Sequence, residues 1–462
     1  MHGVKFIEAP QNWQIYQHIN GNAEIQFRGI FEQHDNLKNI KIWIRVVSED
    51  TGINIVPWTK IKIGAKNSWS GKIKIPIGGL YRIESSMSFT NFSTGTATDI
   101  LPEYGMRGDI RHHIGIGDLY VIAGQSNSVG YAREPINDSP QIGISVRRYN
   151  GCWDLASHPL HDATDTKTLV NMEWGNPAVS PYLNFAKIIY QNVKYPIGLI
   201  PTALGGSPLS RWNPAEKGDL YSAMLSILKT CGKIKAMLWY QGCSDTEPEQ
   251  AAKSYGERFA NMVKEFRKEM KILDLPIFTY QINRFHCIGL ERTHLWAMLK
   301  ETQRIIPKKI KNVFVMSTND CICCDAIHIN SVYNIELGLR LANQVLGELY
   351  GKNKANAPDI ASAKLIAKNK VELTFSNVKN NIYCFEMNVS YLPFTIEDKI
   401  GKLKICDYKL NKNKIIIETD RAIGADAVVH GAHSPEPFVM IPIDRESKLP
   451  MLSFYNFKIT EH

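Results

Sequence analysis

Hydrophobic and polar residues alternate along the first part of the chain, from about residue 13 to residue 110. Ile42, Ile44 and Val46 occupy every second position there, and glycines and prolines that favour turns recur at short intervals. A period of two is typical of strands with one buried face, and short strands at this spacing favour an antiparallel β-sandwich. We therefore expect an N-terminal β-sandwich domain over residues 1–112.

The pattern changes over residues 113–352, where short apolar runs alternate with longer segments of helical period. Tyr255, Phe259, Met262 and Phe266, for example, follow one another at spacings of three and four residues. Such alternation predicts a parallel sheet that carries helices on both faces and has right-handed crossovers. The expected strands are residues 119–123, 197–202, 234–240, 277–282 and 313–317, and a second helix is expected to bury Ile335, Leu339, Ala342, Leu346 and Leu349.

The last part of the chain, residues 353–462, returns to a period of two. Val371, Leu373 and Phe375 alternate with polar residues, and asparagine-rich turns separate such runs. This pattern predicts a C-terminal β-rich domain packed on the middle domain or on the N-terminal one.

A serine follows the first apolar run of the middle domain. The residues from Gly124 to Ser128 come directly after the run 119–123. A buried strand that ends in glycine and then presents a serine is typical of a sharp turn at the mouth of a sheet. Ser126 is therefore a candidate nucleophile, although an isolated serine in this position is more often only a helix cap.

The ends of the other predicted strands also carry unusual residues. Gly205 and Gly206 follow the second strand, Gln241 follows the third, and Asp325 and His328 follow the fifth. Ligand sites of parallel sheets lie at the carboxyl ends of the strands, so we expect these residues to meet at one edge.

These residue types form a set that suits acyl transfer. Asp325 can accept a hydrogen bond from one nitrogen of His328, which leaves the other nitrogen to take the proton of Ser126. The negative charge of a tetrahedral intermediate needs hydrogen-bond donors, and we expect them to be the backbone amides of Ser126 and Gly206 and the side-chain amide of Gln241.

Composition excludes several other classes of function. The 462 residues have an ordinary globular composition with a net charge of +9, and lysines alternate with isoleucine along the predicted strands, as in residues 60–63 and 72–75. This pattern does not favour a nucleic-acid partner. No signal peptide and no apolar run of membrane-spanning length is visible, so we expect a cytoplasmic protein or a mature secreted form without a membrane segment.

The cysteines do not predict a cofactor site. The nine cysteines include Cys321, Cys323 and Cys324, but this cluster lacks the spaced second pair of a zinc site. Ordinary thiols are the favoured interpretation, and a disulfide from this cluster to Cys243 is a minor alternative. We expect neither a metal nor another cofactor.

Four short blocks of the middle domain together resemble a known family. They match the SGNH (GDSL-like) hydrolases and, within that superfamily, the sialate O-acetylesterase and acetylxylan esterase group of carbohydrate esterases. The blocks are Gly124-Gln125-Ser126-Asn127, Gly205-Gly206-Ser207, Trp239-Tyr240-Gln241-Gly242 and the pair Asp325 and His328. The resemblance implies a flavodoxin-like, three-layer α/β/α domain that removes acetyl groups from sugar hydroxyls with the roles given above.

One position departs from the pattern of that group. Its members usually continue Gln-Gly with a glutamate, where this chain has Cys243. A thiol is a weak hydrogen-bond acceptor, so Asp245 is the nearest residue that could replace the carboxylate.

Four further residues are candidates for substrate binding. Gln125 and Asn127 flank the serine, and Arg211 and Trp212 follow the glycine pair at a distance that could reach a pocket rim. A tryptophan face can stack on a sugar ring and arginine suits a carboxylated sugar, although a tryptophan that packs a loop is an equally good interpretation.

The sequence therefore predicts a serine esterase that acts on an O-acetylated carbohydrate, with sialate O-acetylesterase activity as the first hypothesis. An acetylxylan esterase or another SGNH acyl hydrolase is the alternative within the same class of enzyme. A sugar-binding homologue whose site has decayed at Cys243 is the alternative outside it. The sequence does not indicate an oligomeric state.

Overall fold

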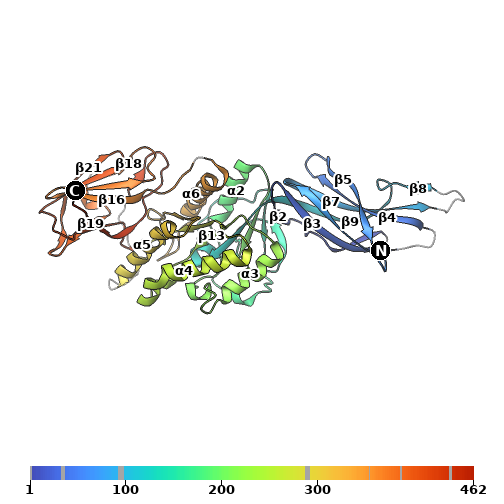
Figure 1. Cartoon of the computed structure of the whole chain (residues 1–462), viewed down its shortest axis with the longest axis horizontal. Coiled ribbons are helices and arrows are strands. Elements are labelled where there is room, and N and C mark those ends of the chain that lie inside the picture. Colours follow the sequence, from blue (N-terminus) through green and yellow to red (C-terminus); the bar gives the residue numbers. More distant parts are fainter. Residues whose placement is uncertain are drawn as a thin grey trace.

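The computed structural model describes residues 3–32, 37–91, 98–286, 292–352, 354–385, 388–435 and 440–461. Three regions follow one another along the long axis of the molecule, with the α/β region between two regions made of strands (Figure 1). Within the described residues, no helix is both long enough and apolar enough to cross a membrane.

The N-terminal strands surround one core of apolar side chains. Phe27, Ile44, Trp69 and Ile83 come from four different strands and pack in that core. Neighbouring strands are antiparallel except β2, which runs parallel to β9. The strands are β1 (Val4–Glu8), β2 (Ile15–Gln17), β3 (Asn22–Phe31), β4 (Leu37–Ser48), β5 (Asn54–Ile63), β6 (Ser68–Pro76), β7 (Gly78–Asn91), β8 (Thr98–Ile100) and β9 (Met106–Gly124).

Strand β9 belongs to two regions at once. Its first half pairs with β7 of the N-terminal region, and its second half pairs with two strands of the central sheet. The predicted domain boundary at residue 112 falls inside this strand, whereas the boundary at residue 352 falls after the last helix of the middle region.

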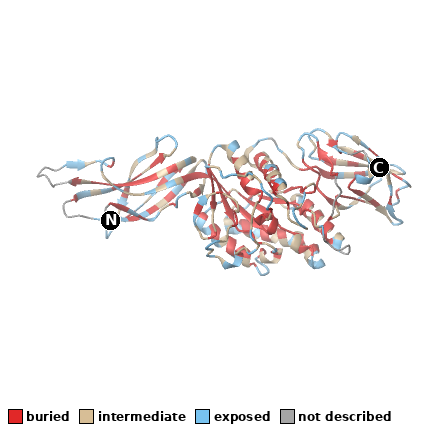
Figure 2. Cartoon of the chain, turned by 180° about the vertical axis from the view of Figure 1, so that it is seen from behind, coloured by how far each residue is buried: buried red, intermediate tan, exposed pale blue. Residues whose placement is uncertain are grey.

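The central sheet contains the five strands predicted from the sequence and two short ones that were not predicted. Its order is β11, β10, β12, β9, β13, β14 and β15, and only β11 is antiparallel to its neighbour. The buried residues of the α/β region gather along these strands and on the inner faces of the helices (Figure 2). The strands not yet named are β10 (Ile144–Arg147), β11 (Trp153–Leu155), β12 (Ile197–Pro201), β13 (Ala236–Tyr240), β14 (Ile277–Tyr280) and β15 (Val313–Met316).

Helices cover both faces of this sheet. One apolar core contains α2 (Tyr182–Val193) and α6 (Ser331–Tyr350), and the other contains α3 (Asp219–Cys231), α4 (Glu249–Met270) and α5 (Thr293–Lys309). The buried face expected for α4 is confirmed. The face expected for α6 is wrong in part, because Leu339 is exposed while Leu337, Leu341 and Val345 are buried.

The C-terminal region is made of strands that share one core. One four-stranded sheet consists of β16 (Asp359–Ala367), β17 (Lys370–Ser376), β22 (Lys414–Thr419) and β21 (Ile405–Asn411). The other consists of β20 (Gly401–Leu403), β19 (Phe394–Asp398), β23 (Val428–Gly431) and β25 (Phe454–Lys458), and β18 (Ile382–Tyr383) pairs with β24 (Ile443–Asp444).

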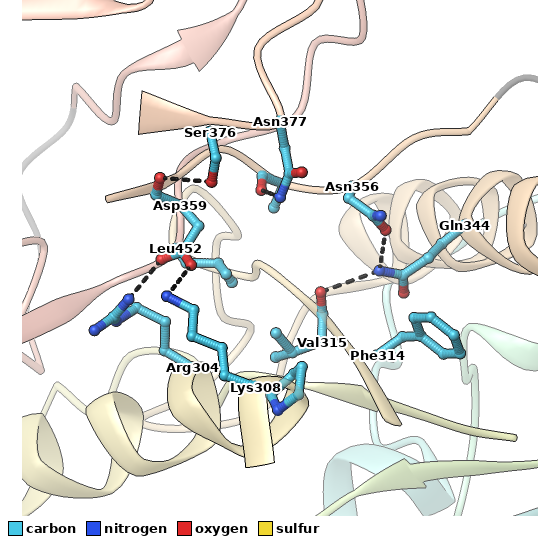
Figure 3. Close-up of a pocket in the computed structure, with 12 residues that line it drawn as sticks. Arg304, Lys308, Phe314, Val315, Gln344, Asn356, Asp359, Ser376, Asn377 and Leu452 are labelled. Atoms are coloured by element: carbon cyan, nitrogen blue, oxygen red, sulfur yellow. Dashed lines mark hydrogen bonds and ion pairs between the residues drawn. The ribbon is translucent and has the colours of Figure 1, made fainter. Parts of the chain in front are cut away.

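An ion-pair network joins the C-terminal region to α5 (Figure 3). Arg304 Nη1 donates to Asp359 Oδ1 at 2.8 Å, and Lys308 Nζ lies 2.7 Å from Asp359 Oδ2. Arg304 Nη2 also lies 2.6 Å from Glu301 Oε1. The carboxylate of Asp359 and the guanidinium of Arg304 are buried, so each needs its partner to compensate for lost hydration.

We expect Asp359→Asn to lower the free energy of unfolding by about 2 kcal/mol, because the amide removes the negative charge that two cations face. Urea unfolding of the whole chain measures this change. Asp426→Asn is the matched control, since Asp426 forms an exposed ion pair with Lys399 in the same region. Equal stability of the two variants would contradict this account of the network.

Candidate active site

The first turn of the site depends on the close approach of β9 and β13. Gly124 has φ of +124°, and a Cβ atom at this position would lie 2.3 Å from the carbonyl oxygen of Tyr240. Only glycine avoids both the strained backbone and this clash. The following residue, Gln125, donates its N–H to the same carbonyl, which places Ser126 at the start of the short helix α1 (Ser126–Val129).

Asp325 and His328 form the hydrogen-bonded pair expected from the sequence. His328 Nδ1 lies 2.7 Å from Asp325 Oδ2, while Asp325 Oδ1 accepts the backbone N–H groups of Ile327 and His328 at 2.8 and 2.7 Å. Partial burial opposes the charge of Asp325, but these hydrogen bonds outweigh it and hold its pKa below the usual range. An ionised Asp325 favours a proton on Nδ1, so that Nε2 of the neutral ring is free to accept one.

The side chain of Asn127 ties the serine turn to the histidine loop. Its Nδ2 donates to the carbonyl of Ile327 at 3.1 Å, and its Oδ1 accepts the N–H of Ile329 at 3.1 Å. Ile327 and Ile329 flank His328, and Asn127 directly follows Ser126. These two bonds therefore hold Ser126 and His328 in adjacent turns at one edge of the sheet.

Two backbone N–H groups expected to stabilise an oxyanion are available. Within the described residues, neither Ser126 nor Gly206 donates its N–H to a protein acceptor. Gly206 is exposed and has φ of +63°, and the space where its Cβ would lie is open. The loop is held at Leu204, whose N–H donates to the carbonyl of Gly124 at 3.1 Å.

Gln241 does not have the free amide expected of an oxyanion donor. It is fully buried, and its Nε2 donates to Ser207 O at 3.2 Å and to Asp245 Oδ2 at 2.5 Å. Both N–H groups are thereby used, so Gln241 braces the loop that carries Ser207. Gln241 therefore has no side-chain N–H group left to donate to an oxyanion.

Asp245 supplies the acceptor that Cys243 cannot. Besides the amide of Gln241, it accepts the N–H of Leu209 at 2.8 Å and binds Arg258 Nη1 at 3.0 Å. Burial raises the pKa of the Asp245 carboxyl, although these hydrogen bonds act in the other direction. Burial also raises the pKa of the Cys243 thiol to about 12, so it stays protonated at neutral pH.

The structure does not support the expected substrate-binding roles of the four neighbouring residues. Trp212 is fully buried and donates to Ser207 Oγ at 3.0 Å, which favours the alternative interpretation of a tryptophan that packs a loop. Arg211 binds the carboxylate of Asp219, with Nη2 2.8 Å from Oδ2. Gln125 Oε1 accepts the N–H of Gly242 at 2.9 Å, and the amide of Asn127 is used as described above.

Two residues that contact the candidate site, Tyr131 and Glu173, were not predicted from the sequence. The ring of Tyr131 lies 4.9 Å from the ring of His328, centroid to centroid. Its hydroxyl donates to Glu173 Oε1 at 2.5 Å, while Glu173 Oε2 accepts the N–H of Gly205 at 2.6 Å. These contacts connect the histidine to the glycine loop, but 42 residues separate Tyr131 from Glu173 and no local motif marks either one.

A cleft of about 750 Å³ opens beside the glycine loop. Arg258 lies on its wall and is already bound to Glu216, with Nε 2.8 Å from Oε1. The cleft is lined by Gly206, Ser210, Asn213, Glu216, Ser244 and Arg258, among others. Gly206, one of the two residues expected to donate to an oxyanion, lines this cleft.

No group of three metal-ligating side chains occurs in the described parts of the chain. The eight cysteines that lie there, Cys243 and the cluster at residues 321–324 included, carry free thiols. The ninth, Cys287, lies outside the described residues.

We expect Tyr131→Phe to lower kcat about tenfold for a small activated ester and to leave KM nearly unchanged, because Glu173 loses a partner that helps it to hold Gly205. The phenyl ring still packs on His328 in this variant. Stopped-flow or steady-state kinetics with 4-nitrophenyl acetate measure the change, and Tyr104→Phe at an exposed position is the control. An unchanged kcat would show that the Tyr131 hydroxyl has no role in positioning.

Comparison with known proteins agrees with this geometry. A probable carbohydrate esterase of Arabidopsis thaliana is 26% identical over 262 residues, which cover 52% of this chain and 94% of that protein. Human sialate O-acetylesterase is 23% identical over 172 residues, but the match covers only 29% of this chain and 32% of the human protein. The crystal structure of a carbohydrate acetylesterase from Xanthomonas citri has the same fold, with a TM-score of 0.66, 18% identity, and coverage of 97% of this chain and 98% of that one.

The model of one protein family matches residues 116–347, which is half of the chain. This segment contains all four sequence blocks and the candidate site residues Ser126, Gly206, Asp325 and His328. The chain belongs to the family of carbohydrate esterases described as sialic acid-specific acetylesterases.

Proposed function

We propose that this protein is a serine esterase that removes O-acetyl groups from a carbohydrate, with Ser126, His328 and Asp325 as its catalytic triad. The observation that carries the proposal is the pair of hydrogen bonds from Asn127 to the two neighbours of His328. They join Asn127, which follows Ser126, to the backbone on either side of His328. Nδ1 of His328 is already bound to the carboxylate of Asp325.

In the first half of the reaction, Ser126 Oγ attacks the acetyl carbonyl carbon and His328 Nε2 takes the serine proton. Asp325 stabilises the imidazolium through Nδ1 without itself accepting the proton. The carbonyl oxygen, now negative, receives hydrogen bonds from the N–H groups of Ser126 and Gly206. One such donor typically contributes about 2.7 to 4 kcal/mol to lowering the barrier.

In the second half, His328 gives its proton to the departing sugar oxygen, which leaves as a free hydroxyl. The acetyl group stays on Ser126 as an ester. A water molecule, deprotonated by His328, then attacks this ester and releases acetate, which restores the serine. The reaction needs only side chains and water, and it consumes no cofactor.

The arrangement of the central sheet supports the assignment to the SGNH fold. The five strands predicted from the sequence lie in the order second, first, third, fourth and fifth, which is the order of flavodoxin-like sheets. Ligands of such sheets bind beside the first strand, where the order of the strands reverses. Ser126 follows that strand.

O-acetylated sialic acid is the first substrate that we propose, since the family description names it. The match to human sialate O-acetylesterase covers only a third of that protein and so gives limited support for a sialic acid substrate. Acetylated xylan is therefore the alternative substrate. A site decayed at Cys243 is the less favoured alternative, because Asp245 accepts the hydrogen bond from Gln241. Acetate release from each substrate separates the three cases.

We expect Ser126→Ala to lower kcat for 4-nitrophenyl acetate by at least about 10³-fold, because the nucleophile is lost and the imidazole can then act only on water. Steady-state kinetics measure this change. Ser139→Ala, at an exposed position with a local hydrogen bond, is the matched control. Equal rates for the wild type and the Ser126 variant would refute the nucleophile assignment.

A further inference from the structure

One tryptophan of this chain is displayed on the surface. The side chain of Trp174 is 77% exposed, whereas the other eight tryptophans, all in the described residues, are buried or half-buried. Leu169 and Val170 are exposed in the same segment. Contiguous exposed apolar side chains of this size commonly mark a binding surface.

The backbone that carries Trp174 is fixed on both sides. Glu173 Oε1 accepts the N–H of Gly175 at 2.8 Å as well as the hydroxyl of Tyr131. Arg133 Nη2 donates to the carbonyls of Gly175 and Asn176 at 2.9 and 3.1 Å. An aromatic ring on an anchored segment loses little conformational freedom when it binds a ligand.

This segment adjoins the catalytic edge. Glu173 directly precedes Trp174, and its carboxylate holds the N–H of Gly205, one residue before the proposed oxyanion donor Gly206. The same carboxylate binds Tyr131, whose ring packs on that of His328. The residue before Trp174 is therefore linked by hydrogen bonds to the glycine loop and to the tyrosine that packs on His328.

Arg133 adds a charged group to this surface. It is exposed, and among the described residues no carboxylate pairs with it. Two other arginines near the site are paired, since Arg211 binds Asp219 and Arg258 binds Glu216 and Asp245. Arg133 has further N–H groups that can donate to oxygen atoms of a ligand.

We propose that Trp174 and Arg133 form the platform that binds the sugar ring of the substrate. Trp174 stacks on the apolar face of the ring, and Arg133 donates to its oxygen atoms, which are carboxylate oxygens in sialic acid and hydroxyl oxygens in xylose. The ring then carries its acetyl group toward Ser126. This inference rests on the proposed esterase function. It assigns recognition of the sugar to residues outside the four sequence blocks.

The test compares Trp174→Ala and Trp174→Phe with the wild type on two kinds of ester. Ethyl acetate carries no sugar, and the sugar substrates are 9-O-acetylated sialic acid and acetylated xylo-oligosaccharide. We expect Trp174→Ala to lower kcat/KM for the better sugar ester, relative to that for ethyl acetate, roughly tenfold, mainly through KM. Trp174→Phe, which keeps an aromatic face, restores most of this ratio.

Arg133→Gln shows whether Arg133 donates to the carboxylate of sialic acid or to sugar hydroxyl groups. A loss of roughly tenfold in relative kcat/KM for the sialic acid ester alone assigns Arg133 to the carboxylate, and a loss for both sugar esters assigns it to hydroxyl groups. No loss for either ester removes Arg133 from the platform. Tyr104→Ala, an exposed aromatic residue of the N-terminal region, is the control and should leave all ratios unchanged.

The two proposals fail in different ways. If the wild type hydrolyses none of these esters, the proposed esterase function is wrong. If the wild type is active and Trp174→Ala keeps the wild-type ratio, the esterase function stands and the platform is refuted. Melting temperatures of the variants identify any loss that comes from unfolding.

Discussion

The proposed active site depends on the two hydrogen bonds that Asn127 makes to the backbone on either side of His328. The serine turn follows β9 and the histidine loop follows β15, and five further strands, β10 to β14, and several helices lie between β9 and β15 in the sequence. Parallel pairing brings both segments to one edge, but it does not fix their distance to within a hydrogen bond. Asn127, which follows β9, both donates to and accepts from the backbone of the loop after β15, and so supplies that precision.

Carboxylates hold the remaining loops of the site. Asp245 gathers the amide of Gln241, the N–H of Leu209 and the guanidinium of Arg258, while Glu173 gathers Tyr131, Gly175 and Gly205. A charged acceptor makes stronger hydrogen bonds than a neutral one. Each of these carboxylates therefore holds several loop segments in place. Asp245, two residues after Cys243, therefore supplies a carboxylate acceptor in the loop where the sequence has Cys243.

The parts of the structure that the sequence predicted are those set by local pattern. Apolar runs located the five main strands, and the spacing of Asp325 and His328 gave their hydrogen bond. Residues whose role depends on distant contacts were not predicted. Trp212 faces Ser207 and the core, and Tyr131 and Glu173 come from two separate segments, one between β9 and β10 and one between β11 and β12. The boundary between the N-terminal and central regions was not predicted to lie inside a strand. The backbone of β9 continues from one region into the other while its pairing partners change.

The central claim is that acetyl transfer passes through Ser126, and the acetyl-enzyme itself gives the most direct test. The protein is mixed with 4-nitrophenyl acetate, quenched with acid during turnover, digested and analysed by mass spectrometry. The account predicts an acetyl group on the Ser126 side chain that disappears when the substrate is exhausted. Turnover with no acetyl group on Ser126, or with a transient acetyl group on another residue, would contradict it.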